Sequence, residues 1–280
     1  MKKISFALFV LLAGLFLPGC EEKWVVITPS SNTGGPTTGE QKRTVLAEEL
    51  TGVRCPNCPE GTAALVALDQ QYGEQLVVVS VHAALGYDVP YPNSLYDFRT
   101  GKGTEMANYI GAAFFFPTAS INRRIVPPET EPYLPRQVWA GIIAEELEKP
   151  LTLGITLKNN FDAGSRKLDI SADLTPLEDL SGEYRITVMI TQDSIVDYQK
   201  VNLVTEPNYM HRHILRSIIT QATGDNIAEP LTANNTVKKT FSTVLPAAWD
   251  AKHCSVVAFV HRGGTPDKEV LQAAEKHVIE

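Results

Sequence analysis

The sequence predicts an α/β domain followed by an all-β sandwich, and three observations support this fold class. Residues 43–150 alternate between strand-like and helix-like apolar patterns, which is typical of an α/β layer architecture. After Pro150 the apolar period becomes two and recurs over six short segments, which indicates a β-sandwich over residues 151–280. The chain has 280 residues, enough for two domains once its N-terminal segments are set aside.

Residues 1–20 are expected to be a lipoprotein signal peptide rather than part of the fold. A basic MKK start precedes an apolar stretch that is too short to span a membrane comfortably, and the stretch ends in LPGC. Glycine directly before Cys20 resembles a bacterial lipobox, in which this cysteine is lipidated and becomes the mature N-terminus. Pro18 is unusual there, and the alternative is a plain secretory peptide with a chance cysteine. Residues 21–42 are rich in Gly, Pro, Ser and Thr and are expected to be a flexible tether, in which WVVIT could add a short edge strand.

The composition limits the partners and the redox chemistry of the chain. A formal net charge of −7 provides no basic surface field that would attract the phosphates of a nucleic acid. No segment after the signal peptide is expected to span a bilayer. Export would place the remaining cysteines, Cys55, Cys58 and Cys254, where disulfides form and persist.

The α/β part is expected to alternate three strands with three helices. Leu65, Leu68 and Tyr72 share one face of the first helix. The valine run at residues 77–79 suits a central parallel strand that is covered on both faces. An apolar stripe marks the third helix, which Pro150 ends. In chain order, the expected elements are residues 43–50, 62–72, 75–82, 104–114, 116–124 and 135–149.

The β part is expected to contain six strands in which apolar and polar side chains alternate. Leu168, Ile170 and Ala172, for example, are separated by polar neighbours, which is the pattern of a strand with one face buried. The segment 208–221 interrupts the series and is expected to be a loop or a short helix. The expected strands are residues 151–160, 167–174, 184–191, 236–245, 254–262 and 269–279.

Cys55 and Cys58 form a C-x-x-C pair within TGVRCPNCPEG, between the first strand and the first helix. This placement is the thioredoxin arrangement, in which a helix N-terminus stabilises a thiolate through its partial positive charge and its free N–H groups. Two intervening residues let the second thiol resolve a mixed disulfide that forms at the first. We therefore expect Cys55 to be the nucleophile and Cys58 the resolving thiol, joined as a disulfide when oxidised.

Two further residues fit the thioredoxin pattern. Glu49 lies six positions before Cys55, where thioredoxins place a buried acid that shuttles a proton for the second cysteine. Burial there would raise the carboxyl pKa and suit proton transfer. The alternative is a solvent-facing Glu49, since we expect one of Glu48 and Glu49 to point outward. Pro117 stands where thioredoxin folds open a strand with a cis-proline, and we expect the cis isomer rather than a trans proline at a strand edge.

Together these pieces resemble the family related to the 28-kilodalton outer-membrane lipoprotein of Bacteroides-type bacteria. The resemblance implies a thioredoxin-like domain at residues 43–150, an immunoglobulin-like sandwich at residues 151–280, and a place in the outer membrane of the cell envelope. The sequence departs from typical thioredoxin at Arg54, where a tryptophan usually precedes the first cysteine, so substrate choice and redox potential do not carry over. The matching segments, which cover most of residues 44–280, are EELTG with CPNCPEG, then VSVHAA, YDFRTGKGTEMANYIG, FPTASINR, HRHILR and EVLQAAE.

Other residues offer weaker candidate sites. A zinc ion would need two more ligands beside Cys55 and Cys58, and neither Cys254 nor the six histidines provide a second cluster in the α/β part, so we expect no metal. His211 and His213 could face one side of a strand, but a surface loop of the sandwich is the simpler interpretation. Cys254 begins an apolar run and is expected to be a small buried hydrophobe.

Two functions remain open at this point. The first is a membrane-tethered thiol-disulfide oxidoreductase, in which Glu49 moves protons and Pro117 docks the substrate backbone. Its partners would be exported proteins or peptides and a membrane electron donor, without a bound cofactor. The second is a periplasmic or surface-exposed binding or adhesion lipoprotein with a static C-x-x-C disulfide, since the acidic residues after Cys20 resemble surface-export signals. The loop Tyr87–Tyr96 could be a peptide-binding rim or packing around an insertion.

Overall fold

The computed structural model of the chain describes residues 41–264 and 267–279. The predicted signal peptide with Cys20 at its end, and nearly all of the predicted tether at 21–42, lie outside these residues. Within the described ranges, no helix is long and apolar enough to cross a membrane.

The N-terminal part of the described chain has the predicted alternation of strands and helices. Helix α1 begins earlier than predicted because Pro59 occupies its first turn, a position that suits proline. Helix α2 begins at Gly101 because the Thr100 side chain accepts a hydrogen bond from the Gly103 N–H and caps the helix. In chain order, the elements are β1 (Val45–Thr51), α1 (Cys58–Tyr72), the 3₁₀ turn η1 (Gly73–Gln75), β2 (Leu76–His82), α2 (Gly101–Ile110), β3 (Thr118–Ile121), β4 (Tyr133–Pro135) and α3 (Arg136–Leu147).

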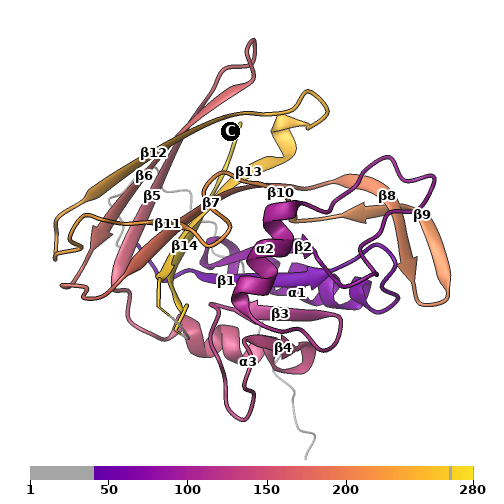
Figure 1. The fold of residues 1–280 in the computed structure, drawn as a ribbon, viewed down its shortest axis with the longest axis horizontal. Coiled ribbons are helices and arrows are strands. Elements are labelled where there is room, and N and C mark those ends of the chain that lie inside the picture. Colours follow the sequence, from indigo (N-terminus) through magenta and orange to yellow (C-terminus); the bar gives the residue numbers. More distant parts are fainter. Residues whose placement is uncertain (1–40, 265–266, 280) are drawn as a thin grey trace, which may run out of the picture. The chain divides into compact units, whose positions relative to one another are not determined.

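Strand β1 is the centre of this part of the fold. It pairs in parallel with β2 on one side and antiparallel with β3 on the other, and every residue of β1 and β2 is buried. Helices α1 and α3 cover one face of these strands through a core that includes Leu65 and Trp139. Helix α2 covers the other face through Met106 and Ile110 (Figure 1). The predicted central strand with both faces covered is therefore confirmed.

All six strands predicted after Pro150 are present, and four further strands were not predicted. The short turn η2 (Ala251–His253) leads into β13. The strands are β5 (Leu153–Phe161), β6 (Lys167–Pro176), β7 (Tyr184–Gln192), β8 (Ile195–Val201), β9 (Val204–His211), β10 (Ile214–Ile218), β11 (Asp225–Asn226), β12 (Val237–Val244), β13 (Cys254–Arg262) and β14 (Val270–His277).

One sheet runs through both predicted domains. Its strand order is β14-β13-β7-β10-β2-β1-β3-β4, with β11 paired to β7. Strand β10 joins the two halves, because Ile214 pairs in parallel with Ser80 and the Ser80 N–H donates to the His213 carbonyl oxygen at 2.8 Å. The predicted boundary at residue 150 lies between α3 and β5, and the hydrogen bonding of the sheet continues across it.

A second β layer packs against the C-terminal strands of this sheet. It has the antiparallel order β12-β6-β5, and Figure 1 shows these three strands side by side. Alternate residues of β6 are buried, as expected for a strand with one covered face. The core between the layers includes Ile155 and Ile170 from the second layer and Val188 and Val256 from the first. Two packed β layers are therefore present after residue 150.

The segment 208–221, predicted to be a loop or a short helix, instead completes β9 and forms β10. This prediction was wrong because neither strand has a clean apolar alternation. Strand β9 is mostly exposed, and β10 has only five residues. Strands β8 and β9 form a separate two-stranded sheet that leaves the main sheet after β7 and returns at β10.

The expectation that one of Glu48 and Glu49 points to solvent was also wrong, because both side chains are fully buried. They lie on opposite faces of β1, and both faces are covered. Glu48 forms a bidentate ion pair with Arg123, with N–O distances of 2.7 and 2.9 Å and no exposure of either side chain. The Arg123 guanidinium also lies 4.7 Å from the ring centre of Phe259 on β13. This pair therefore links β1 to the C-terminal half.

We expect Arg123→Met to lower the free energy of unfolding by about 3–5 kcal/mol, because Glu48 would keep a buried carboxylate without its cation. Urea unfolding followed by circular dichroism measures this change. Arg136→Met is the matched control. Its ion pair with Glu60 is 41% and 58% exposed, so the expected loss is about 0–1 kcal/mol. Equal losses in the two variants would contradict the role of the buried pair.

Candidate redox site

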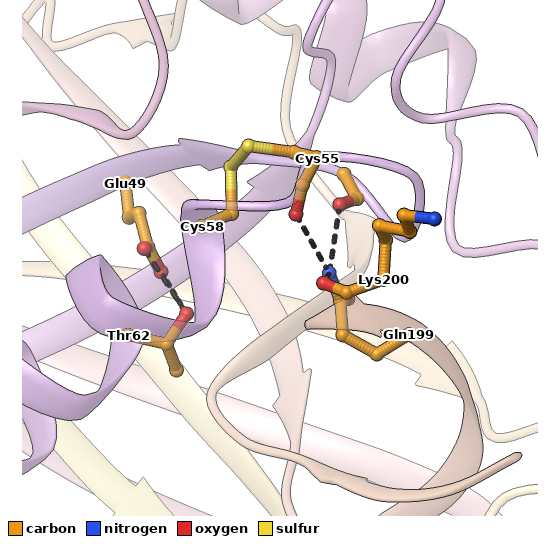
Figure 2. The surroundings of a disulfide bond; sticks show 7 residues. Glu49, Cys55, Cys58, Thr62, Gln199 and Lys200 are labelled. Atoms are coloured by element: carbon orange, nitrogen blue, oxygen red, sulfur yellow. Dashed lines mark hydrogen bonds between the residues drawn. A yellow bond between two sulfur atoms is a disulfide. The ribbon is translucent and has the colours of Figure 1, made fainter. Parts of the chain in front are cut away.

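Cys55 and Cys58 are joined by a disulfide, with their Cα atoms 5.4 Å apart, where β1 passes into α1 (Figure 2). The loop that connects β1 to α1 requires glycine at residue 52, because a Cβ atom there would lie 2.5 Å from the Tyr87 carbonyl oxygen. That same oxygen accepts a hydrogen bond from the Arg54 N–H at 2.7 Å. The predicted disulfide is thus confirmed, and it lies at the predicted junction of strand and helix.

The start of α1 provides the electrostatic setting for the disulfide. Cys58 is the first residue of the helix, and Asn57 stands at the N-cap position without a side-chain hydrogen bond to the helix. The N-terminal end of the helix therefore keeps its partial positive charge uncompensated by a side-chain cap. A thiolate at this end of the helix is stabilised by that charge.

Glu49 lies against the first turns of α1, and Figure 2 shows its carboxylate next to Thr62 on that helix. Its carboxylate accepts hydrogen bonds from the Thr62 hydroxyl at 3.1 Å and from the Ser80 hydroxyl at 2.9 Å. Burial raises the pKa of Glu49 to about 7, although both hydroxyls act in the opposite direction. No cation pairs with Glu49 among the described residues. A carboxyl group with this pKa both accepts and releases protons near neutral pH.

Pro117 follows a cis peptide bond from Phe116, as predicted. It lies against Gly61 in the first turns of α1, because a Cβ atom on Gly61 would be 2.6 Å from the Pro117 Cβ. The same Cβ would be 3.0 Å from a carboxylate oxygen of Glu49. Glycine at this position thus lets Pro117 and Glu49 approach the helix that begins at Cys58, and the structure brings together the four residues predicted for the redox site.

Strand β8 also contributes to this site, which was not predicted from the sequence. The Gln199 side-chain amide donates to the carbonyl oxygens of Gly52 and Cys55, both at 3.2 Å (Figure 2). Backbone N–H groups that follow it also donate to the cysteine loop, from Lys200 to Val53 and from Asn202 to Pro56. Gln199 follows Cys55 by 144 residues, and no local sequence signal reveals a contact of this range.

Both cysteines of the disulfide are buried. Cys55 is 2% exposed and Cys58 is 1% exposed. The loop Tyr87–Tyr96 also packs beside the site, because the Arg54 guanidinium donates to the carbonyl oxygens of Val89 and Pro90 and lies 4.6 Å from the ring centre of Tyr91. Arg54, which stands where thioredoxins usually have tryptophan, thus anchors this loop beside the cysteines.

The other candidate sites differ from the redox site. Cys254 is a free thiol with no exposure, and burial raises its pKa to about 12, which confirms it as a small buried hydrophobe. The interpretation of His211 as part of a surface loop was wrong. His211 is the last residue of β9, and its side chain is buried. Its ring centre lies 4.7 Å from that of Phe98 and 4.9 Å from that of Tyr209. In residues 41–264 and 267–279, no three His, Cys, Asp or Glu side chains gather as a metal site.

The fold and the site define a class of protein that joins a mixed α/β half with a C-x-x-C disulfide to a half of packed β layers. The family model described as outer membrane protein Omp28 matches residues 104–280. The chain belongs to the Omp28 family. This membership confirms the predicted location in the outer membrane of the cell envelope. The match begins after Cys58, so it does not include the C-x-x-C motif.

Two solved structures have a similar fold over most of this chain at low sequence identity. HBP35 of Porphyromonas gingivalis is 18% identical, with a TM-score of 0.65 over 86% of this chain and 76% of that chain. A protein from Agrobacterium tumefaciens is 14% identical, with a TM-score of 0.55 over 86% of this chain and 97% of that chain. A crystallised domain of the outer membrane lipoprotein Omp28 from Porphyromonas gingivalis is 17% identical, with a TM-score of 0.33 over 46% of this chain and 90% of that chain. No curated protein matches the sequence. The likeness to HBP35 is one of fold and extends over both halves of this chain.

We expect Glu49→Gln to remove a pH-dependent loss of stability. The folded pKa of about 7 lies above the ordinary 4.5, so the stability that Glu49 contributes is complete below pH 4.5 and is lost as the pH rises through 7. Unfolding free energies measured at pH 5 and pH 8 should fall by roughly 3 kcal/mol more in the wild type than in the variant. Glu60→Gln, at an exposed carboxyl of the same helix start, is the control and should behave as wild type. A wild-type pH profile in Glu49→Gln would contradict the raised pKa.

Proposed function

We propose that this outer-membrane lipoprotein exchanges disulfides with exported proteins or peptides through Cys55 and Cys58. The observation that carries the proposal is Glu49, a buried carboxyl group with a pKa of about 7 beside the helix that begins at Cys58. A disulfide that only stabilises the loop needs no proton carrier, and burying an unpaired carboxyl group is unfavourable to folding. The buried Glu49 is therefore better explained by proton transfer to the leaving thiolate during disulfide exchange.

In the proposed exchange, a substrate thiolate attacks the Cys55 sulfur and the Cys55–Cys58 bond breaks. Cys58 leaves as a thiolate and takes a proton from Glu49, while a mixed disulfide joins Cys55 to the substrate. A second substrate thiolate then attacks the substrate sulfur and releases Cys55. Two electrons pass from the substrate dithiol to the cysteine pair, and the reverse sequence reduces a substrate disulfide. A membrane electron carrier would restore the starting state.

Pro117, the N-terminal segments and the C-terminal β layers also have roles in the proposed function. Pro117 would dock the backbone of the substrate beside Cys55. Residues 1–20 would act as the signal peptide, lipidated Cys20 would anchor the protein, and the tether over residues 21–42 would separate it from the membrane. The two packed β layers after residue 150 would form an immunoglobulin-like sandwich, which is supported by their antiparallel pairing and shared core.

A second candidate function is a binding or adhesion lipoprotein in which the disulfide is static. The observation that favours it is the enclosure of both cysteines, since their exposed fractions are 2% and 1%. A buried disulfide that is hydrogen-bonded into its surroundings resists exchange with protein thiols.

Disulfide exchange by the purified full chain tests the proposal. We expect the protein, supplied with dithiothreitol, to accelerate insulin reduction, and Cys55→Ser to abolish the acceleration because the attacking sulfur is lost. Cys58→Ser should accumulate a mixed disulfide at Cys55. Cys254→Ser is the matched control and should retain activity, since this thiol is buried away from the site. Wild type and Cys55→Ser that are equally inactive in all redox buffers would refute exchange.

The reduction potential of the Cys55–Cys58 couple separates the two candidate functions. Exchange-active couples span about −270 to −120 mV, whereas structural disulfides lie below about −300 mV. We expect a value in the first range, because the start of α1 stabilises the thiolate of the reduced form. Equilibration in glutathione or dithiothreitol buffers followed by thiol alkylation and mass spectrometry provides the value. A potential below −300 mV would favour the static disulfide.

A further inference from the structure

The β8–β9 hairpin, residues 195–211, is the element of the C-terminal half that contacts the loop carrying Cys55. Its two strands pair only with each other, apart from the main sheet. Beyond Gln199, it docks on the cysteine loop through two backbone hydrogen bonds, from Lys200 to Val53 at 2.7 Å and from Asn202 to Pro56 at 2.9 Å. Strand β8 thus binds to the loop without joining the sheet that carries it.

Gln199 is the side chain that fixes the hairpin to the loop. It is 3% exposed, and its amide nitrogen donates to the carbonyl oxygens of Gly52 and Cys55 on the loop and of Lys200 on its own strand. Asp197, on the same face of β8, accepts a hydrogen bond from the Tyr96 N–H at 2.9 Å. These polar contacts lie beside a small apolar cluster in which Ile195 of β8 packs with Val53, Phe98 and Ile214.

The hairpin joins the main sheet through two short connections, which the His213 N–H ties together by donating to Asp193 Oδ1 at 2.8 Å. Two residues connect β7 to β8 and two connect β9 to β10. Each connection contains one non-glycine residue in the left-handed region, Ser194 with φ of 58° and His213 with φ of 53°. This conformation is unfavourable for residues with a side chain, so the closed position holds strain at both connections. Rotation at these short connections would move the hairpin as a unit.

The interior beneath the hairpin contains polar atoms that closure leaves without partners. His211 on β9 lies against His82 at the end of β2, with ring centres 6.0 Å apart. Within the described residues, both ring nitrogens of His82 and the Nε2 atom of His211 are buried without a hydrogen-bond partner. Such groups are unfavourable in a closed interior and would gain hydrogen bonds to water on opening. The closed hairpin therefore buries polar atoms that opening to water would hydrogen-bond.

We propose that the β8–β9 hairpin is a lid over the Cys55–Cys58 disulfide. It opens about Ser194 and His213 and is held closed by Gln199. The inference rests on the proposed disulfide exchange and assigns the regulation of the same site. A protein substrate reaches Cys55 only when the hairpin is displaced, whereas the closed form protects the couple from bystander thiols.

Hydrogen exchange of the wild-type protein tests the lid without any substitution. We expect backbone amides of residues 195–211 to exchange faster than those of β7 and β13, because the hairpin opens without global unfolding. Mass spectrometry of peptic peptides resolves these segments. Hairpin amides that exchange in step with β7 and β13 would overturn the lid.

Reduction kinetics provide the second test. We expect Gln199→Leu to accelerate reduction of the Cys55–Cys58 disulfide by a protein dithiol about tenfold, because two hydrogen bonds that favour the closed form are lost. Alkylation of the released thiols followed by mass spectrometry gives the rate. Gln272→Leu is the matched control, because Gln272 is also buried and hydrogen-bonded, to Thr44 and Lys42, but lies on β14. Equal rates for both variants would overturn the lid.

The two proposals fail in different ways. A hairpin that exchanges early, together with an insulin assay that shows no activity, would leave the lid in place and refute disulfide exchange. Catalysed insulin reduction, together with a hairpin that stays protected until global unfolding, would support disulfide exchange and refute the lid.

Discussion

Strand β1 is enclosed on both faces, and the two neighbouring carboxyl groups that it places there must be stabilised inside the protein. Glu48 has a cationic partner in Arg123, whereas Glu49 has only the hydroxyls of Thr62 and Ser80. The first carboxylate therefore ties the two halves together, and the second is left with a pKa near neutrality. The same enclosure fixes α1 against β1 and so determines where Cys58 lies. Glu48 thus stabilises the fold, and Glu49, on the opposite face of β1, provides the titratable group beside the disulfide.

The shared sheet explains how the C-terminal half reaches the redox site. Strand β10 pairs beside the end of β2, so the chain between β7 and β10 leaves the sheet next to the loop that carries Cys55. The β8–β9 hairpin occupies this insertion and donates hydrogen bonds to that loop. The candidate site is therefore formed by both halves of the protein, although the predicted domain boundary assigns it to the first half alone.

Features that depend on local patterns could be predicted from the sequence. The valine run predicted β2, and the alternation after Pro150 predicted six strands. The C-x-x-C spacing predicted the disulfide, and the match to the thioredoxin pattern predicted the buried acid and the cis-proline. Features that depend on distant contacts were missed. The burial of Glu48 requires Arg123, and the polar, mostly exposed β9 has no period that marks it as a strand. The sheet that crosses residue 150 follows from a pairing that no local window contains.

The separation of 144 residues between Cys55 and Gln199 has a consequence for how the protein matures. A chain that emerges N-terminus first presents its cysteine pair well before the hairpin exists, and N-terminal segments generally fold first. Oxidation of the nascent pair can thus be completed by any oxidant at the site of emergence. The later arrival of the C-terminal strands then seals whichever redox state has formed. The order of synthesis would therefore determine whether the cysteine pair is first oxidised or reduced in the folded protein.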